Sequence, residues 1–193
     1  DVRGQAICAL NEGMITLYLE DYAAGRAASR RGLDLARQMN SHLMEANALA
    51  NLGAAERELG ELGEAIAHME EGLAIRRTLG QPAELGTDLC DLTVAYCRQG
   101  NFAAAQHALT EMLDVYAHAE ASMMHPQYIL WAAAQTYRML GDEACAHDYL
   151  KRAVLVMQQR LADIPEPELQ ASYYELPFNR QIVAASERGV WPG

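Results

Sequence analysis

Apolar residues recur along this chain every three or four positions, and strict alternation of apolar and polar residues is absent. That spacing places apolar side chains along one face of an α-helix. Alanine, leucine, arginine and glutamate, which favour helix, dominate the composition, and five of the six prolines lie at or beyond residue 126. The pattern predicts helices over 5–19, 22–38, 42–59, 62–79, 82–99, 102–118, 125–140 and 143–162.

The helical pattern repeats along the chain. "GELGEAIAHMEEGLAI" from Gly60 aligns with "GNFAAAQHALTEMLDV" from Gly100 and "GDEACAHDYLKRAVLV" from Gly141, while "EDYAAGRAASRRGLDL" from Glu20 keeps the same register. The offsets between copies are 40, 40 and 41 residues. Each copy reads as a helix, a tight turn and a second helix, and the turn glycines suit the left-handed conformation that ends a helix. Four helical hairpins are therefore expected over 5–38, 42–79, 82–118 and 125–162.

Other glycines fall inside the expected helices, where each costs about 1 kcal/mol relative to alanine. They occupy matching positions of the repeat that hold small residues in most copies: Gly13, Gly53, Thr93 and Ala134; Gly25, Ala65, Ala105 and Ala146; Gly32, Gly72, Met112 and Ala153. The chain has no G-x-G-x-x-G after a strand and no G-K-[ST] phosphate loop. We interpret these glycines as sites of close helix packing rather than as a ligand cradle.

The segment "LTVAYCRQGNFAAAQHAL" carries a family resemblance. Its Leu92, Tyr96, Gly100, Phe102 and Ala105 stand where the tetratricopeptide repeat has its signature residues. The resemblance implies a right-handed superhelix of hairpins whose first helices line a concave groove. The first copy departs from the pattern because it has no turn glycine. The period of 40 residues also exceeds the usual length of about 34, so longer helices, or loops such as 119–126, must absorb the surplus.

The C-terminal segment "PELQASYYELPFNRQIVAASER" resembles the closing helices of tetratricopeptide segments in large bacterial signalling regulators, through the stretch from Leu176 to Arg180. Those proteins combine an ATPase core with a DNA-binding or cyclase module. One lysine beside 14 arginines suggests a high-GC bacterial source. We expect a helix that opens at Glu166 or Glu168 and ends at Pro177, then a short helix to about Glu187, together covering the apolar edge of the last hairpin. The expected organisation is an array over 1–163 and a capping segment over 164–193.

Charge and composition narrow the possible partners. The net charge is −11, and no stretch carries the basic patch needed to neutralise phosphates, so direct binding of nucleic acid is not expected. No apolar run approaches the roughly 20 residues of a membrane span. The four cysteines, Cys8, Cys90, Cys97 and Cys145, form no C-x-x-C motif, which fits free thiols in the cytoplasm. Because the chain opens at Asp1, we expect it to be a segment of a larger protein.

Candidate catalytic groups do not combine into a recognisable set. His68, His107 and His147 fall near the same stretch of successive second helices, so a row of metal ligands is conceivable, but surface histidines without a ligand explain them more simply. Neighbouring carboxylates such as Glu70 and Glu71 point apart on a helix. The sequence predicts a non-enzymatic protein with no cofactor and no metal.

The groove of the resembled family supplies the candidate binding site. In that family an asparagine of the first helix often bonds the backbone of an extended peptide, and spaced arginines and amides could hold an acidic or C-terminal carboxylate group. The candidate groove residues are Asn11, Asn51, Arg57, Asp91, Arg98, Tyr128, Trp131, Gln135 and Arg138. A purely structural alternative remains open: the asparagines tie neighbouring helices together, and the arginines pair with Glu58 and Asp91.

The sequence thus predicts an all-α tetratricopeptide-like solenoid that binds a protein or peptide in its concave groove. We expect it to serve interaction and sensing in signal transduction within a larger bacterial regulator, a transcriptional one. A small-molecule inducer site and self-association into a homo-oligomer are the alternatives.

Overall fold

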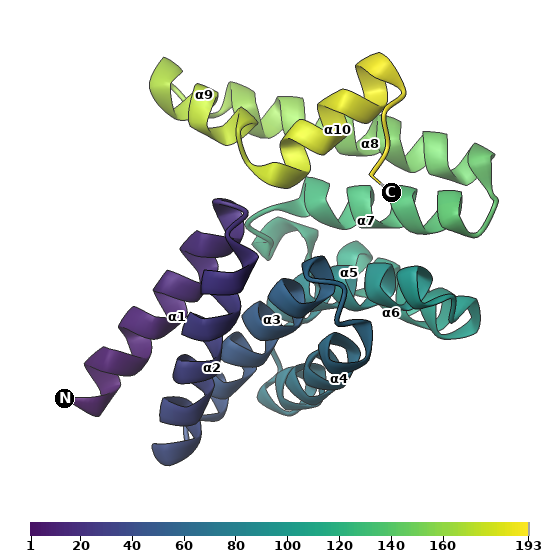
Figure 1. Cartoon of the computed structure of the whole chain (residues 1–193). Coiled ribbons are helices and arrows are strands. Elements are labelled where there is room, and N and C mark those ends of the chain that lie inside the picture. The colour runs from purple at the N-terminus through teal and green to yellow at the C-terminus, as the bar shows by residue number, and fades with distance from the viewer. Residues whose placement is uncertain (193) are drawn as a thin grey trace.

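The computed structural model describes residues 1–192 and is almost entirely helical (Figure 1). Over this range the chain forms ten α-helices and one short 3-10 helix, with no strand. The helices are α1 (Val2–Tyr18), α2 (Tyr22–Gln38), α3 (His42–Glu58), α4 (Leu62–Leu79), α5 (Pro82–Gln99), α6 (Phe102–Ala119), η1 (Glu120–Ser122), α7 (Pro126–Met139), α8 (Glu143–Ala162), α9 (Pro167–Tyr174) and α10 (Pro177–Arg188).

The expected hairpins are confirmed. Helices α1 and α2, α3 and α4, α5 and α6, and α7 and α8 pack as antiparallel pairs, and each pair stacks on the next, as Figure 1 shows. Most helices run 17 to 20 residues, and the turns inside the hairpins are short. Longer helices therefore absorb most of the extra residues in each repeat, with η1 filling the longer connection between α6 and α7.

The turns inside the hairpins adopt the left-handed conformation that the glycines suggested. Gly60, Gly100 and Gly141 have φ angles of +84°, +81° and +83°. The first hairpin makes the same turn with Glu20, at φ +60°, although a side chain makes this conformation less favourable. The repeat geometry is therefore kept in the copy that lacks the glycine.

The glycines within helices mark places where two helices of a hairpin nearly touch. A Cβ atom on Gly53 would lie 2.6 Å from Met69 Cγ and 3.1 Å from the carbonyl oxygen of Ala65. One on Gly72 would lie 3.2 Å from Leu49 Cβ. Close packing of α3 against α4 thus explains these glycines. Gly63 is different, since a Cβ atom added there would meet nothing within 4 Å.

The C-terminal segment folds back over the array. Helix α9 ends at Tyr174, and Pro177 is the first residue of α10 rather than the end of the preceding helix, so the predicted boundary is corrected here. Proline suits the first helical position because its missing N–H has no partner there in any helix. Helix α10 packs on α8 and α7 through Phe178, Ile182 and Ala185, which are all buried (Figure 1).

Candidate functional site

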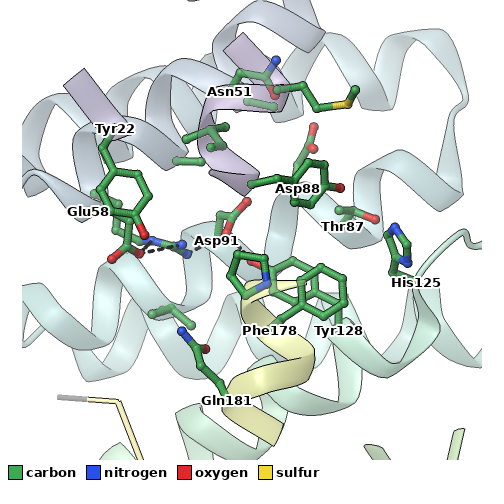
Figure 2. A pocket seen from close by; sticks show the side chains of 18 of the residues that line it. Tyr22, Asn51, Glu58, Thr87, Asp88, Asp91, His125, Tyr128, Phe178 and Gln181 are labelled. Carbon is green, nitrogen blue, oxygen red and sulfur yellow. Dashed lines mark hydrogen bonds and ion pairs between the residues drawn. The ribbon is translucent and has the colours of Figure 1, made fainter. Parts of the chain in front are cut away.

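The concave side of the array contains a cavity of about 240 Å³. Its walls come from the first helices of all four hairpins, α1, α3, α5 and α7, with Tyr22 from the start of α2. Helix α10 contributes Pro177, Phe178 and Gln181. We call this space the concave cavity, and these three residues its roof. Figure 2 shows Phe178 beside Tyr128 in this cavity.

One wall of the concave cavity is a network of opposite charges. Arg57 donates from Nη1 to Asp91 Oδ1 at 2.6 Å and from Nε to Glu58 Oε1 at 2.8 Å. Arg98 Nη1 donates to the other oxygen of Glu58 at 3.2 Å, and the Tyr128 hydroxyl donates to Asp91. Burial alone would raise the pKa of Glu58, but Arg57 and Arg98 outweigh it and lower that pKa. Glu58 is therefore ionised and paired with both arginines.

A second ion pair, between Arg76 of α4 and Asp88 of α5, lies at the wall of the cavity. The buried Arg76 donates from Nε to Asp88 Oδ2 at 2.9 Å, and also bonds Gln81 and Asn47 at 2.9 Å and 2.8 Å. Burial raises the pKa of Asp88 to about 6, although Arg76 opposes the shift. Asp88 lines the cavity, whereas Arg76 lies behind it.

Three consecutive residues fix the N-terminal turn of α10 over the cavity. Phe178 packs its ring 5.2 Å from that of His125 and 5.0 Å from that of Tyr128. Asn179 is fully buried, accepts a hydrogen bond from Gln127 at 3.2 Å and donates to the carbonyl oxygen of Tyr173 at 2.7 Å. Arg180 reaches the first hairpin, where its Nη2 bonds Glu20 Oε2 at 2.6 Å. The Phe-Asn-Arg part of the C-terminal motif thus holds the roof in place.

Six of the nine predicted groove residues line the concave cavity: Asn51, Arg57, Asp91, Arg98, Tyr128 and Gln135. Some of these residues also have the purely structural role considered above, in which they tie helices together or pair with acidic residues. Asn51 Nδ2 donates to the carbonyl oxygen of Leu10 at 3.3 Å and so ties α3 to α1. Both arginines pair with Glu58, and Arg57 also pairs with Asp91. Gln135 has no such tie to another described residue.

Three of the predicted residues, Asn11, Trp131 and Arg138, do not line the concave cavity. Asn11 is exposed on α1. Trp131 is fully buried, because Gln181 accepts a hydrogen bond from its Nε1 at 3.0 Å and the ring of Trp191 stacks on it at 5.2 Å. The Arg138 guanidinium lies 4.7 Å from the centre of the Trp191 ring. The C-terminal segment therefore covers two positions that the repeat pattern alone would leave in the groove.

Sequence reasoning missed several residues of the concave cavity. Phe178 and Gln181 come from the C-terminal segment, more than 40 residues after Gln135, and the repeat register says nothing about where that segment lies. The signal that pointed to it was the unusual stretch from Leu176 to Arg180. Tyr22 and His125 were missed because they lie at the starts of their helices. Asp88 was missed because it is not at one of the repeat positions that were used to predict the groove.

Fold and site together define a class: a solenoid of helical hairpins with a cavity on its concave side. Residues 5–78, which span the first two hairpins, match the family model for the tetratricopeptide repeat. The match supports a tetratricopeptide assignment there, and the next two hairpins repeat the same geometry. No curated protein matches the chain.

The family match carries a general functional meaning. Tetratricopeptide repeats generally mediate protein–protein interaction, and they are typically scaffolds rather than enzymes.

Within residues 1–192, no helix has both the length and the apolar character that crossing a membrane requires. Over the same residues, no three histidine, cysteine, aspartate or glutamate side chains gather closely enough to hold a metal ion.

Proposed function

We propose that this chain is a non-enzymatic interaction and sensing segment that holds part of a partner protein or peptide in the concave cavity. The observation that carries the proposal is that one cavity collects side chains from the first helix of every hairpin. A ligand bound there contacts the whole array at once. Its binding therefore changes the packing between hairpins. A sensor segment of a larger bacterial transcriptional regulator needs such a change in order to pass the signal to other domains.

The roof limits what can bind. Phe178 and Gln181 enter the cavity from α10, so a long extended peptide cannot run the length of the groove while α10 stays in place (Figure 2). A volume of about 240 Å³ suits a chain end or a short loop. The partner thus inserts a few residues, and the rest of its surface contacts the rim.

Site-specific photo-crosslinking in the full-length regulator tests this function. A benzoylphenylalanine placed at Ala54, on the cavity wall, should crosslink one defined partner. The same residue at exposed Gln106, on α6 and away from the cavity, is the matched control and should not. Asn51→Ala and Arg98→Ala should each weaken the Ala54 crosslink without unfolding the array. Equal crosslinking from both positions would contradict the proposal.

The roof also favours a second candidate, a small-molecule inducer site, because small ligands bind in concave pockets that combine apolar side chains with a few polar groups. A thermal-shift screen of the chain with metabolites and with short peptides separates the two. Stabilisation by a metabolite, with no crosslink from Ala54 to any protein, would favour the inducer.

A further inference from the structure

We propose that one exposed face of α1 binds the same face of a second copy of this chain, in an antiparallel helix pair whose two-fold axis passes beside Asn11. This interaction surface is separate from the partner proposed for the concave cavity. Three features carry the inference: the composition of the face, the contacts at the two ends of the array, and the order of the residues around Asn11.

Helix α1 lies at one end of the array, where it packs on α2 and α3 (Figure 1). Its remaining face carries no charged side chain. The residues of this face recur at the three- and four-residue spacing that aligns side chains on a helix. All are exposed, and they are Ile7, Cys8, Asn11, Met14, Ile15 and Tyr18. We call these six residues the α1 face. Large apolar side chains gathered in this way mark an interaction surface.

The α1 face does not suit a further hairpin of the repeat. Each later first helix packs against the second helix of the preceding hairpin. At the position of Glu12, those helices hold Leu52, Leu92 and Ala133, which are all buried. Glu12 itself is exposed and pairs with Arg31 at 2.7 Å. A hairpin stacked on α1 in the same way would bury this ion pair, which is costly.

The other end of the array is closed to stacking between copies. Helix α10, rather than a further hairpin, packs on α8 there, and its Phe178, Ile182 and Ala185 are buried. Copies of the chain therefore do not join end to end through α1 and α8. A closed pair is the form of self-association that remains, and in such a pair each copy presents the same face.

The α1 face has the order that matches itself in an antiparallel pair. Ile7 and Ile15 lie four residues before and after Asn11, and Cys8 and Met14 lie three residues before and after it. When the two Asn11 residues lie opposite each other, Ile7 of each copy meets Ile15 of the other. Cys8 likewise meets Met14. The contacts around the axis are thus apolar in both directions.

Asn11 supplies the polar group at the centre of this pair. An asparagine amide donates and accepts at the same time, so two of them across a two-fold axis can bond each other. A single polar residue within an apolar helix pair fixes its register. Charge also favours this face, because the chain has a net charge of −11 and two copies repel each other in general. An uncharged face is where their approach costs least.

Sedimentation equilibrium of the whole chain tests the pair. One pair of helices buries less area than most stable dimers, so a Kd on the order of 10 µM is expected. Ile15→Asp should weaken the dimer at least about tenfold, because it buries an unpaired charge. Leu155→Asp is the matched control and should leave the Kd unchanged, since Leu155 on α8 is 55% exposed and Ile15 is 52% exposed. A monomer up to near-millimolar protein, or equal effects of both substitutions, would overturn the inference.

Crosslinking tests the register at a protein concentration above the Kd. In a Cys8→Ser background, Asn11→Cys places two thiols beside the axis, and bismaleimidoethane should join the two copies. The Cys8→Ser chain alone is the control for the remaining cysteines and should give no dimer band. Gln106→Cys in the same background, on exposed α6, should give none either. A dimer band as strong from Gln106→Cys as from Asn11→Cys would contradict the proposed pairing.

Another occupant of the α1 face would leave a different signature. If another segment of the full-length protein covers the face, the isolated chain stays monomeric and its exposed Cys8 reacts with maleimide, while Cys8 of the full-length protein is protected. That combination would overturn self-pairing. All of these substitutions leave Met14 and Tyr18, which also line the concave cavity, unchanged. The crosslink from Ala54 therefore still reports on the proposed function separately.

Discussion

Arg180 in α10 donates a hydrogen bond of 2.6 Å to the carboxylate of Glu20, which lies 160 residues earlier in the turn between α1 and α2. This ion pair, which we call the latch, joins the last helix to the first hairpin. Its acidic member is also the residue that holds the left-handed turn in place of glycine. The latch and the burial of Phe178 and Asn179 together hold α10 over the concave cavity.

The latch should contribute little to overall stability. Its two side chains are 45% and 44% exposed, and exposed ion pairs contribute about 0.2–1 kcal/mol. A double-mutant cycle with Glu20→Gln and Arg180→Gln, measured by urea unfolding, should give a coupling in that range that shrinks at high salt. Glutamine keeps the size of the Glu20 side chain and preserves a side chain at the strained turn. A coupling above about 2 kcal/mol would mean that the latch is a dominant contact.

The close approach of α3 and α4 at Gly53 can be tested with a matched pair of glycines. Gly53→Ala should destabilise the array by roughly 1–3 kcal/mol, because the new Cβ would lie 2.6 Å from Met69 Cγ and 3.1 Å from a backbone oxygen. Gly63→Ala, in the first turn of α4 with open space around it, should stabilise by roughly 0.5–1 kcal/mol. Urea unfolding measures both, and an equal effect at the two positions would refute the packing explanation.

The final residues should stabilise the fourth hairpin. Trp191 stacks on Trp131 and lies under the Arg138 guanidinium, and such aromatic pairs contribute about 0.5–1.5 kcal/mol beyond their buried area. Trp191→Ala should lower the free energy of unfolding by about 1–2 kcal/mol and change the near-ultraviolet circular dichroism of Trp131. Tyr174→Ala, which truncates a 39% exposed aromatic residue on α9, is the control. If both variants are equally stable, the stacked pair contributes nothing measurable.

Asp88 should make the stability depend on pH. Its pKa in the fold is about 6, raised from 3.8 by burial, so the folded chain holds this proton more tightly than the unfolded chain. This contribution is fully present below about pH 4 and is lost as the pH rises through 6. The unfolding free energy of the wild type should therefore fall by roughly 1–3 kcal/mol relative to Asp88→Asn between pH 4 and pH 7. An unchanged difference across that range would show that Arg76 keeps Asp88 ionised throughout.

The helical array could be predicted from the sequence because each hairpin repeats the same pattern of apolar, small and turn residues. The helix ends fell within a few residues of those observed, and Gly60, Gly100 and Gly141 marked their turns correctly. These features depend on local spacing and backbone conformation, which four copies reveal more clearly than one.

The roof of the site could not be predicted in the same way. Trp131 was expected on the groove surface, and it is buried because Gln181 and Trp191, 50 and 60 residues later, cover it. The C-terminal segment has no counterpart in the repeats, so its position depends on contacts that no internal comparison records. Pro177 was misread for a related reason, since a proline fits either just beyond one helix or at the start of the next.

The latch has a consequence for how this chain can change by gene duplication. Open solenoids tolerate the gain or loss of a unit, because each unit contacts only its neighbours. Here an added hairpin between the second and third copies would carry Glu20 away from Arg180 and lift the first turn from the last helix. Variants with three or five hairpins should therefore lose the contact between the first turn and α10, even where every remaining unit still folds.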